Sequence, residues 1–185
     1  MLFRSIDVDV TRPVQFRFAD SVRGELRRDV NVVPAVAVGL DTRLLVVPTG
    51  AAPKPQRLVV RVAGFSPQGV AGTLRLKLPA GWTSTPTEAP FSLKGAGEKT
   101  STPFVVTPPA RRTAGTVSIA AEAVVGSTTF TKDVQVVEYP HIQTHRLYAP
   151  ATATVQVVDL KVAPVKVGYI MGSGDEVPDA IRRMG

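Results

Sequence analysis

The chain has 185 residues, of which 44% are hydrophobic and 20% are charged, and a chain of this length buries roughly 70% of its unfolded surface on folding. Its 16 prolines and 15 glycines disfavour a helical bundle, and the lack of cysteine excludes disulfide bonds and thiolate metal sites. The formal net charge of +7 indicates either an acidic partner or a basic, solvated surface.

Apolar residues alternate with other residues along most of the chain, a pattern that predicts β-strands. The first such run is 14–18, and a charged stretch from Asp20 to Asp29 follows it. Later alternating runs lie at 58–62, 74–78 and 117–119. Proline and glycine clusters that favour turns separate the runs, at 48–50, 66–69, 79–81, 94–97 and 108–109. Many short strands with frequent turns predict a mostly β protein, an immunoglobulin-like antiparallel β-sandwich.

We divide the chain into three parts. Residues 1–33 form an N-terminal arm with one strand, and residues 34–138 hold about seven strand candidates, the number that an immunoglobulin-like sandwich requires. Residues 139–185 contain apolar strands at 154–162 and 165–170 and a helix that begins near Asp175. This last part predicts a short strand-turn-helix stub of an α/β domain, because the second strand of a β-α-β unit is missing.

No group of residues predicts catalysis or a bound cofactor. The sequence at 172–174, Gly-Ser-Gly, lacks the third glycine of a dinucleotide-binding loop, because Val177 stands in its place. His141 and His145 would lie about 13 Å apart on an extended chain, too far to share one metal ion. We therefore expect a protein that is not an enzyme, with no catalytic, cofactor-binding or metal-binding residues.

The basic run at 23–28 predicts either a solvated loop or a docking patch for an acidic partner. A nucleic-acid site would need exposed aromatic residues between the basic ones, so a protein partner is favoured and nucleic acid is not expected. The apolar face of the C-terminal stub would also be exposed unless a partner covers it. The candidate docking residues are Arg23, Arg27, Arg28, Ile181, Arg182, Arg183 and Met184.

Trp82, the only tryptophan, follows a Pro-Ala-Gly turn at the end of a strand. Its large apolar ring favours a role as a plug at one end of the sandwich core. The alternative is a platform on which a sugar ring stacks, and Tyr148 is the second candidate for that role. The carbohydrate alternative requires Trp82 to be exposed in a groove.

Several segments together resemble the C-terminal portion of large bacterial PIG-L (LmbE-like) deacetylases. These segments are 16–20 (Phe-Arg-Phe-Ala-Asp), 24–28 (Gly-Glu-Leu-Arg-Arg), 78–82 (Leu-Pro-Ala-Gly-Trp), 139–142 (Tyr-Pro-His-Ile) and 167–170 (Val-Gly-Tyr-Ile), with 174–175 and Pro178. Within this region, 34–138 resembles the NPCBM-associated NEW domain, an immunoglobulin-like module also found beside glycosidases. The metal-binding His-Pro-Asp-Asp motif of the deacetylase domain has no counterpart in the sequence, so the resemblance implies no catalytic residue here.

The expected function is that of a non-catalytic subunit that docks onto a larger protein assembly and stabilises it. A membrane-extrinsic subunit of a respiratory or photosynthetic complex is one such role, with peripheral membrane association. The alternative is a carbohydrate-recognition accessory module of a deacetylase- or glycosidase-like protein. The first residues do not form a secretory signal, and no apolar stretch reaches the ~20 residues of a membrane-spanning helix. The family resemblance nevertheless favours the periplasmic face.

Overall fold

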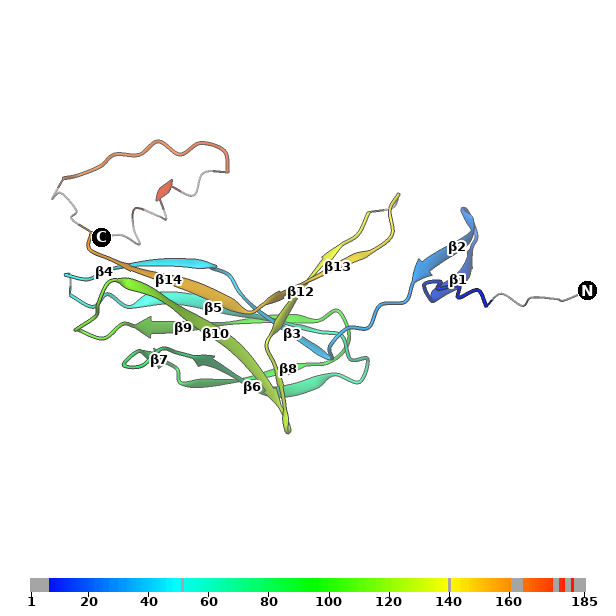
Figure 1. Cartoon of the computed structure of the whole chain (residues 1–185), viewed down its shortest axis with the longest axis horizontal. Coiled ribbons are helices and arrows are strands. Elements are labelled where there is room, and N and C mark those ends of the chain that lie inside the picture. Colours follow the sequence, from blue (N-terminus) through cyan, green and yellow to red (C-terminus); the bar gives the residue numbers. More distant parts are fainter. Residues whose placement is uncertain are drawn as a thin grey trace, which may run out of the picture. The chain divides into compact units, whose positions relative to one another are not determined.

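The structure, a computed structural model, describes residues 7–50, 52–139, 141–160, 165–174, 177–178 and 181. Strands dominate these residues, and Figure 1 labels most of them. The strands are β1 Gln15–Asp20, β2 Gly24–Asp29, β3 Val36–Leu40, β4 Leu44–Pro48, β5 Gln56–Gly64, β6 Val70–Lys77, β7 Thr83–Thr85, β8 Glu88–Leu93, β9 Lys99–Thr107, β10 Gly115–Val125, β11 Thr128–Phe130, β12 Lys132–Val137, β13 His145–Pro150 and β14 Thr152–Val158.

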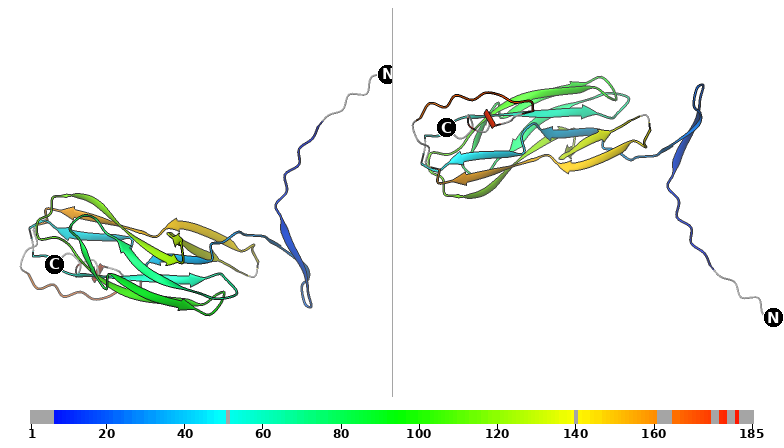
Figure 2. Two further views of the ribbon diagram at one scale, coloured as in Figure 1. Left: turned by 90° about the horizontal axis from the view of Figure 1, so that it is seen from below. Right: turned by 90° about the horizontal axis from the view of Figure 1, so that it is seen from above.

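Two sheets form an immunoglobulin-like β-sandwich. One sheet has the order β4-β14-β10-β6-β8, with β11 also paired to β10, and the other has the order β3-β5-β9-β7. Strand β14 pairs antiparallel with β10 and parallel with β4, so it lies between them. Figure 2 shows β14, in orange, beside the light-blue β4 in both views. The sandwich therefore takes in β14, which the sequence analysis places in the third part of the chain.

The core consists of the inward-facing residues of these strands. Period-two alternation places Leu58, Val60 and Val62 of β5 on the inner face, and all three are buried. The other sheet contributes the buried Leu74 of β6 and Ile119 of β10. The alternating runs at 58–62, 74–78 and 117–119 thus correspond to core strands, and the expectation of a mostly β sandwich is confirmed.

The chain divides into two compact units, one of residues 1–33 and 135–147, and one of residues 34–134 and 148–185. In the first unit, β1 and β2 form an antiparallel hairpin. The charged stretch after the first strand is therefore largely a second strand, and the expectation of a loop at 23–28 is wrong. A tight turn makes this possible, because Gly24 has a φ of +78° and the Asp20 side chain accepts hydrogen bonds from the amides of Val22 and Arg23.

The C-terminal stub differs from the expectation. Residues 165–170 form no strand, and β14 ends at Val158. A strand needs a hydrogen-bonding neighbour, and none of the described strands pairs with 165–170, where Val165, Val167 and Ile170 are exposed. Val177, Pro178 and Ile181 have helical backbone, whereas the expected helix start at Asp175 lies outside the described residues.

Candidate binding surfaces

The β1–β2 hairpin is amphipathic. Its register pairs Phe16 with Arg28 and Phe18 with Leu26, so these four side chains share one face. The two phenyl rings stack with centroids 5.7 Å apart, and the Arg28 guanidinium lies 5.6 Å from the centroid of the Phe18 ring. Phe16 is 61% exposed. This face, which we call the aromatic face, therefore offers apolar surface to solvent.

The opposite face of the hairpin is charged and internally paired. Glu25 lies 3.5 Å from the Arg17 guanidinium and 3.0 Å from that of Arg27. Gln15 donates a hydrogen bond of 2.9 Å to the Asp29 carboxylate. Because these groups are exposed, each ion pair contributes little to stability. The alternation of side chains along each strand thus separates the charged groups from the aromatic residues.

The Asp20 carboxylate fixes the turn of the hairpin. The backbone amides of Arg23 and Val22 donate hydrogen bonds of 2.8 and 2.9 Å to its Oδ1. These hydrogen bonds, with a smaller contribution from the Arg23 charge, hold the pKa of Asp20 below its ordinary value of 3.8. The amides of the turn therefore favour the ionised form of Asp20.

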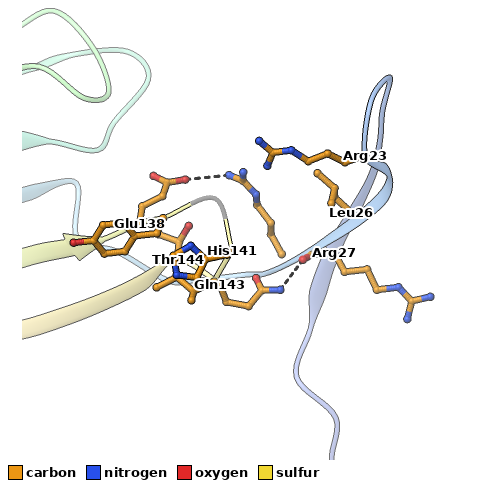
Figure 3. A pocket seen from close by; sticks show the side chains of 10 residues that line it. Arg23, Leu26, Arg27, Glu138, His141, Gln143 and Thr144 are labelled. Atoms are coloured by element: carbon orange, nitrogen blue, oxygen red, sulfur yellow. Dashed lines mark hydrogen bonds and ion pairs between the residues drawn. The ribbon is translucent and has the colours of Figure 1, made fainter.

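A hollow of about 470 Å³ lies between β2 and residues 138–139 and 141–144, all within the first unit. We call it the arginine hollow. Arg28 Nη1 lies 3.3 Å from Glu138 Oε1, and Gln143 Nε2 donates a hydrogen bond of 2.8 Å to the carbonyl oxygen of Arg27. Figure 3 shows Arg23 reaching from the hairpin toward the segment that carries Glu138, whereas the Arg27 side chain points away from it.

A second cavity, of about 700 Å³, lies at one end of the sandwich. We call it the Trp82 cavity. The loop between β6 and β7 lines it with Pro79 and Trp82, and the loop between β9 and β10 lines it with Pro109, Arg111 and Arg112. Val117 of β10 and Val157 of β14 complete the apolar part of the wall.

Trp82 is half-buried and packs against the core, so it serves as the expected plug and also lines the cavity. Its side chain makes no hydrogen bond with the described part of the chain. In that part of the chain, Arg146 Nε is the one buried side-chain nitrogen or oxygen without a hydrogen-bond partner, so the indole nitrogen of Trp82 is not buried. The indole N–H of Trp82 is therefore open to solvent and free to donate.

The two neighbouring arginines of the cavity differ in their contacts. Arg112 Nε donates a hydrogen bond of 2.7 Å to the Pro48 carbonyl oxygen, and its Nη1 donates one of 3.0 Å to that of Pro109. Arg112 thus ties the β9–β10 loop to the end of β4. Arg111 is exposed and makes no hydrogen bond or ion pair with any described residue.

The candidate site residues fall in different places. Arg23, Arg27 and Arg28 line the arginine hollow, and Ile181 is half-buried in the second unit. Tyr148 is 45% exposed and does not line the Trp82 cavity. The other candidates, Arg182, Arg183 and Met184, lie outside the described residues.

Several lining residues could not be recognised in the sequence, because they come from segments that are distant along the chain. Glu138, Ile142 and Gln143 line the arginine hollow, 110 or more positions after the basic run. Arg111 and Thr113 line the Trp82 cavity from a proline-rich loop. The one available signal was the Pro108-Pro109 turn followed by two arginines.

The histidines take no part in a metal cluster in the described portion of the chain, where no group of three or more histidine and carboxylate side chains could hold a metal ion. His141 lines the arginine hollow, and its ring centroid lies 6.0 Å from that of Tyr139. Among the described residues, no helix has the length and apolar character needed to cross a membrane.

One family model matches the chain. Residues 66–126 match the NPCBM-associated, NEW3 domain of alpha-galactosidase. The match covers β6 to β10, including the loops that carry Trp82 and Arg111. This domain is an accessory, non-catalytic module, and the comparisons show no catalytic family. The NEW-type domain is thus supported, and the resemblance to PIG-L deacetylases stays a prediction.

Several solved structures are similar to the chain at low sequence identity. The PapD-like domain 7 of human CEP192 is 10% identical, with 71% of this chain and 92% of that one covered and a TM-score of 0.37. The E. coli chaperone DraB is 14% identical, with coverages of 69% and 58% and a TM-score of 0.36. WR4, an MSP family member of C. elegans, is 9% identical, with coverages of 65% and 97% and a TM-score of 0.33. A search of curated proteins found no match.

Proposed function

We propose that the chain is a non-catalytic accessory module that docks onto a carbohydrate-active protein through its first unit. Two things support the proposal: the match of residues 66–126 to an accessory domain of alpha-galactosidase, and the exposed aromatic face of the β1–β2 hairpin. The comparisons give no support to a role as a subunit of a membrane complex, so the proposal does not include that role.

The observation that carries the proposal is the uncovered apolar surface of the hairpin. Beside Phe16, Val14 is 73% exposed and Val30 is 56% exposed, and an amide-to-carbonyl hydrogen bond of 2.9 Å between these valines extends the pairing of β1 and β2. A two-stranded hairpin is marginally stable in water by itself. A partner that covers this face would remove apolar surface from water and stabilise the hairpin.

The charges near the hairpin indicate the character of the partner. Of the three arginines that line the arginine hollow, Arg28 is paired with Glu138 and Arg27 with Glu25, whereas the Arg23 side chain makes no ion pair with a described residue. An apolar face bordered by the positive charge of Arg23 is complementary to an acidic rim around an apolar patch. On the basis of the sequence resemblance, we propose the catalytic domain of a PIG-L-type deacetylase as the partner that offers such a patch.

Calorimetric titration of the full chain with the purified catalytic domain of a PIG-L-type deacetylase tests this function. Phe16→Thr keeps a residue that favours strands but removes the aromatic anchor, so we expect affinity to fall about tenfold or more. The control is Leu44→Thr, at an exposed position of β4 in the sandwich. Equal affinity of the two variants, or no binding of the unaltered chain, would contradict the proposal.

Carbohydrate recognition at the Trp82 cavity is a second candidate function. The specific observation is that the matched domain places its only tryptophan, with a free indole N–H, in the wall of a cavity of about 700 Å³. This volume lies within the range of about 300–1,000 Å³ typical of small-molecule sites. Because Trp82 is the sole tryptophan, a saturable change in tryptophan fluorescence on adding oligosaccharides would report directly on this cavity.

A further inference from the structure

We propose that the ligand of the Trp82 cavity is an acidic saccharide, a sugar that carries a carboxylate, such as a uronic acid. This inference rests on the second candidate function and adds the chemical class of the sugar. Three features of the cavity wall carry it: its charge, its free hydrogen-bonding groups and its division between a fixed and a free arginine.

The wall of the cavity is positively charged. Among the described residues that line it, Arg111 and Arg112 are the two charged ones, and none is an aspartate or glutamate. A neutral sugar would leave the Arg111 charge without a partner, whereas a carboxylate would complement it. Guanidinium groups bind carboxylates through two parallel hydrogen bonds, which gives directional as well as electrostatic selectivity.

The two arginines have separate tasks in this arrangement. Arg112 already donates to the carbonyl oxygens of Pro48 and Pro109, so it holds the loops in place. Arg111 has no hydrogen bond or ion pair with a described residue, so binding a carboxylate would break no existing contact. Arg111 is therefore the residue that we expect to bind the acid group.

The remaining wall suits a sugar ring. Trp82 presents a half-buried aromatic ring with a free N–H, and the side chains of Thr49 and Thr113 make no hydrogen bond with the described residues. Aromatic surface packs against the apolar face of a sugar ring, and hydroxyl groups donate to and accept from its hydroxyls. Pro79 and Pro109 supply further apolar surface with little conformational freedom.

The test uses the full chain and Trp82 fluorescence. The chain is titrated at low ionic strength with disaccharides of galacturonate, glucuronate and mannuronate, and with neutral disaccharides of the same three configurations. We expect saturable quenching, with an affinity about tenfold or more higher for an acidic disaccharide than for its neutral counterpart. Added salt should lower the affinity for the acidic disaccharide. Arg111→Met should abolish this preference without changing the melting temperature, because Arg111 holds no other group. The matched control is Arg57→Met, at an exposed position of β5.

The possible results separate the two ideas. If neutral disaccharides bind as tightly as acidic ones, carbohydrate recognition stands and the acidic ligand is wrong. If no disaccharide of either kind changes the fluorescence, both are wrong. If Arg111→Met and the control Arg57→Met both keep the preference for acidic over neutral disaccharides, the acid group does not bind at this cavity and the proposal is overturned.

Discussion

The contacts of Arg112 predict that this side chain stabilises the end of the sandwich on which the Trp82 cavity lies. Its guanidinium ties the loop between β9 and β10 to the end of β4, through a hydrogen bond of 2.7 Å from Nε to the Pro48 carbonyl oxygen, and it also donates from Nη1 to the Pro109 carbonyl oxygen of its own loop at 3.0 Å. Arg112→Met keeps most of the aliphatic stem but removes both hydrogen bonds. Arg111→Met, at the preceding position, removes a guanidinium that makes no hydrogen bond or ion pair with a described residue.

The magnitude follows from these two hydrogen bonds. A hydrogen bond to a charged group contributes about 1.5–3 kcal/mol when well shielded, and Arg112 is only partly buried. We therefore expect Arg112→Met to lower the free energy of unfolding by about 2–4 kcal/mol. For a domain of this size, each 1 kcal/mol shifts the melting temperature by about 2–4 °C, which gives a decrease of roughly 5–15 °C.

Thermal unfolding followed by circular dichroism measures the difference between the neighbouring variants. Arg111→Met should unfold within about 0.5 kcal/mol of the unaltered chain, as exposed substitutions usually do. Arg112→Lys should lie between the two, because an ammonium cannot reproduce the planar fork that reaches two carbonyl groups. Equal stability of Arg111→Met and Arg112→Met would refute this account of the loops.

Three further predictions concern the sandwich and the hairpin. Gly72→Ala should destabilise the sandwich, because a Cβ there would lie 2.2 Å from the Val124 carbonyl oxygen, and urea unfolding measures the loss. Phe104→Ala, in the fully buried core, should lower the free energy of unfolding by about 3–5 kcal/mol in the same assay. The pKa of Asp20 is lowered, so its contribution to the turn should be present above the ordinary value of 3.8 and lost as the pH falls through the lowered pKa. An NMR titration that follows the Asp20 carboxyl and the Val22 and Arg23 amides checks this last point, and a pKa at or above 3.8 would contradict it.

Core strands such as β5 were predictable because they bury one face only. Leu58, Val60 and Val62 alternate with residues that face outward, and this period of two is visible in the sequence. At 165–170 a similar pattern predicted a strand, but the structure has no strand there. A strand requires a hydrogen-bonding neighbour, and that requirement depends on the topology of the sheet, which the local pattern does not contain.

The candidate binding residues were predictable only where they are neighbours in the sequence. Arg23, Arg27 and Arg28 stand together in the chain, so their charge could be recognised directly. Arg111 could not be connected with Trp82, because the two belong to different loops that the pairing of β7 with β9 brings to the same end of the sandwich. Long-range strand pairing thus determines which cationic group shares a cavity with the aromatic ring.

The same alternating pattern leads to buried apolar residues in the sandwich and to exposed ones in the hairpin, and this difference supports the proposed docking function. In the sandwich, β5 has a hydrogen-bonded neighbour on each side and an opposing sheet, so its apolar residues are buried. In the hairpin, β1 pairs with β2 alone, and Phe16 stays 61% exposed. The sandwich therefore meets its requirement for apolar burial within its own fold. The hairpin does not, and its aromatic face is the surface that would gain stability when a partner covers it.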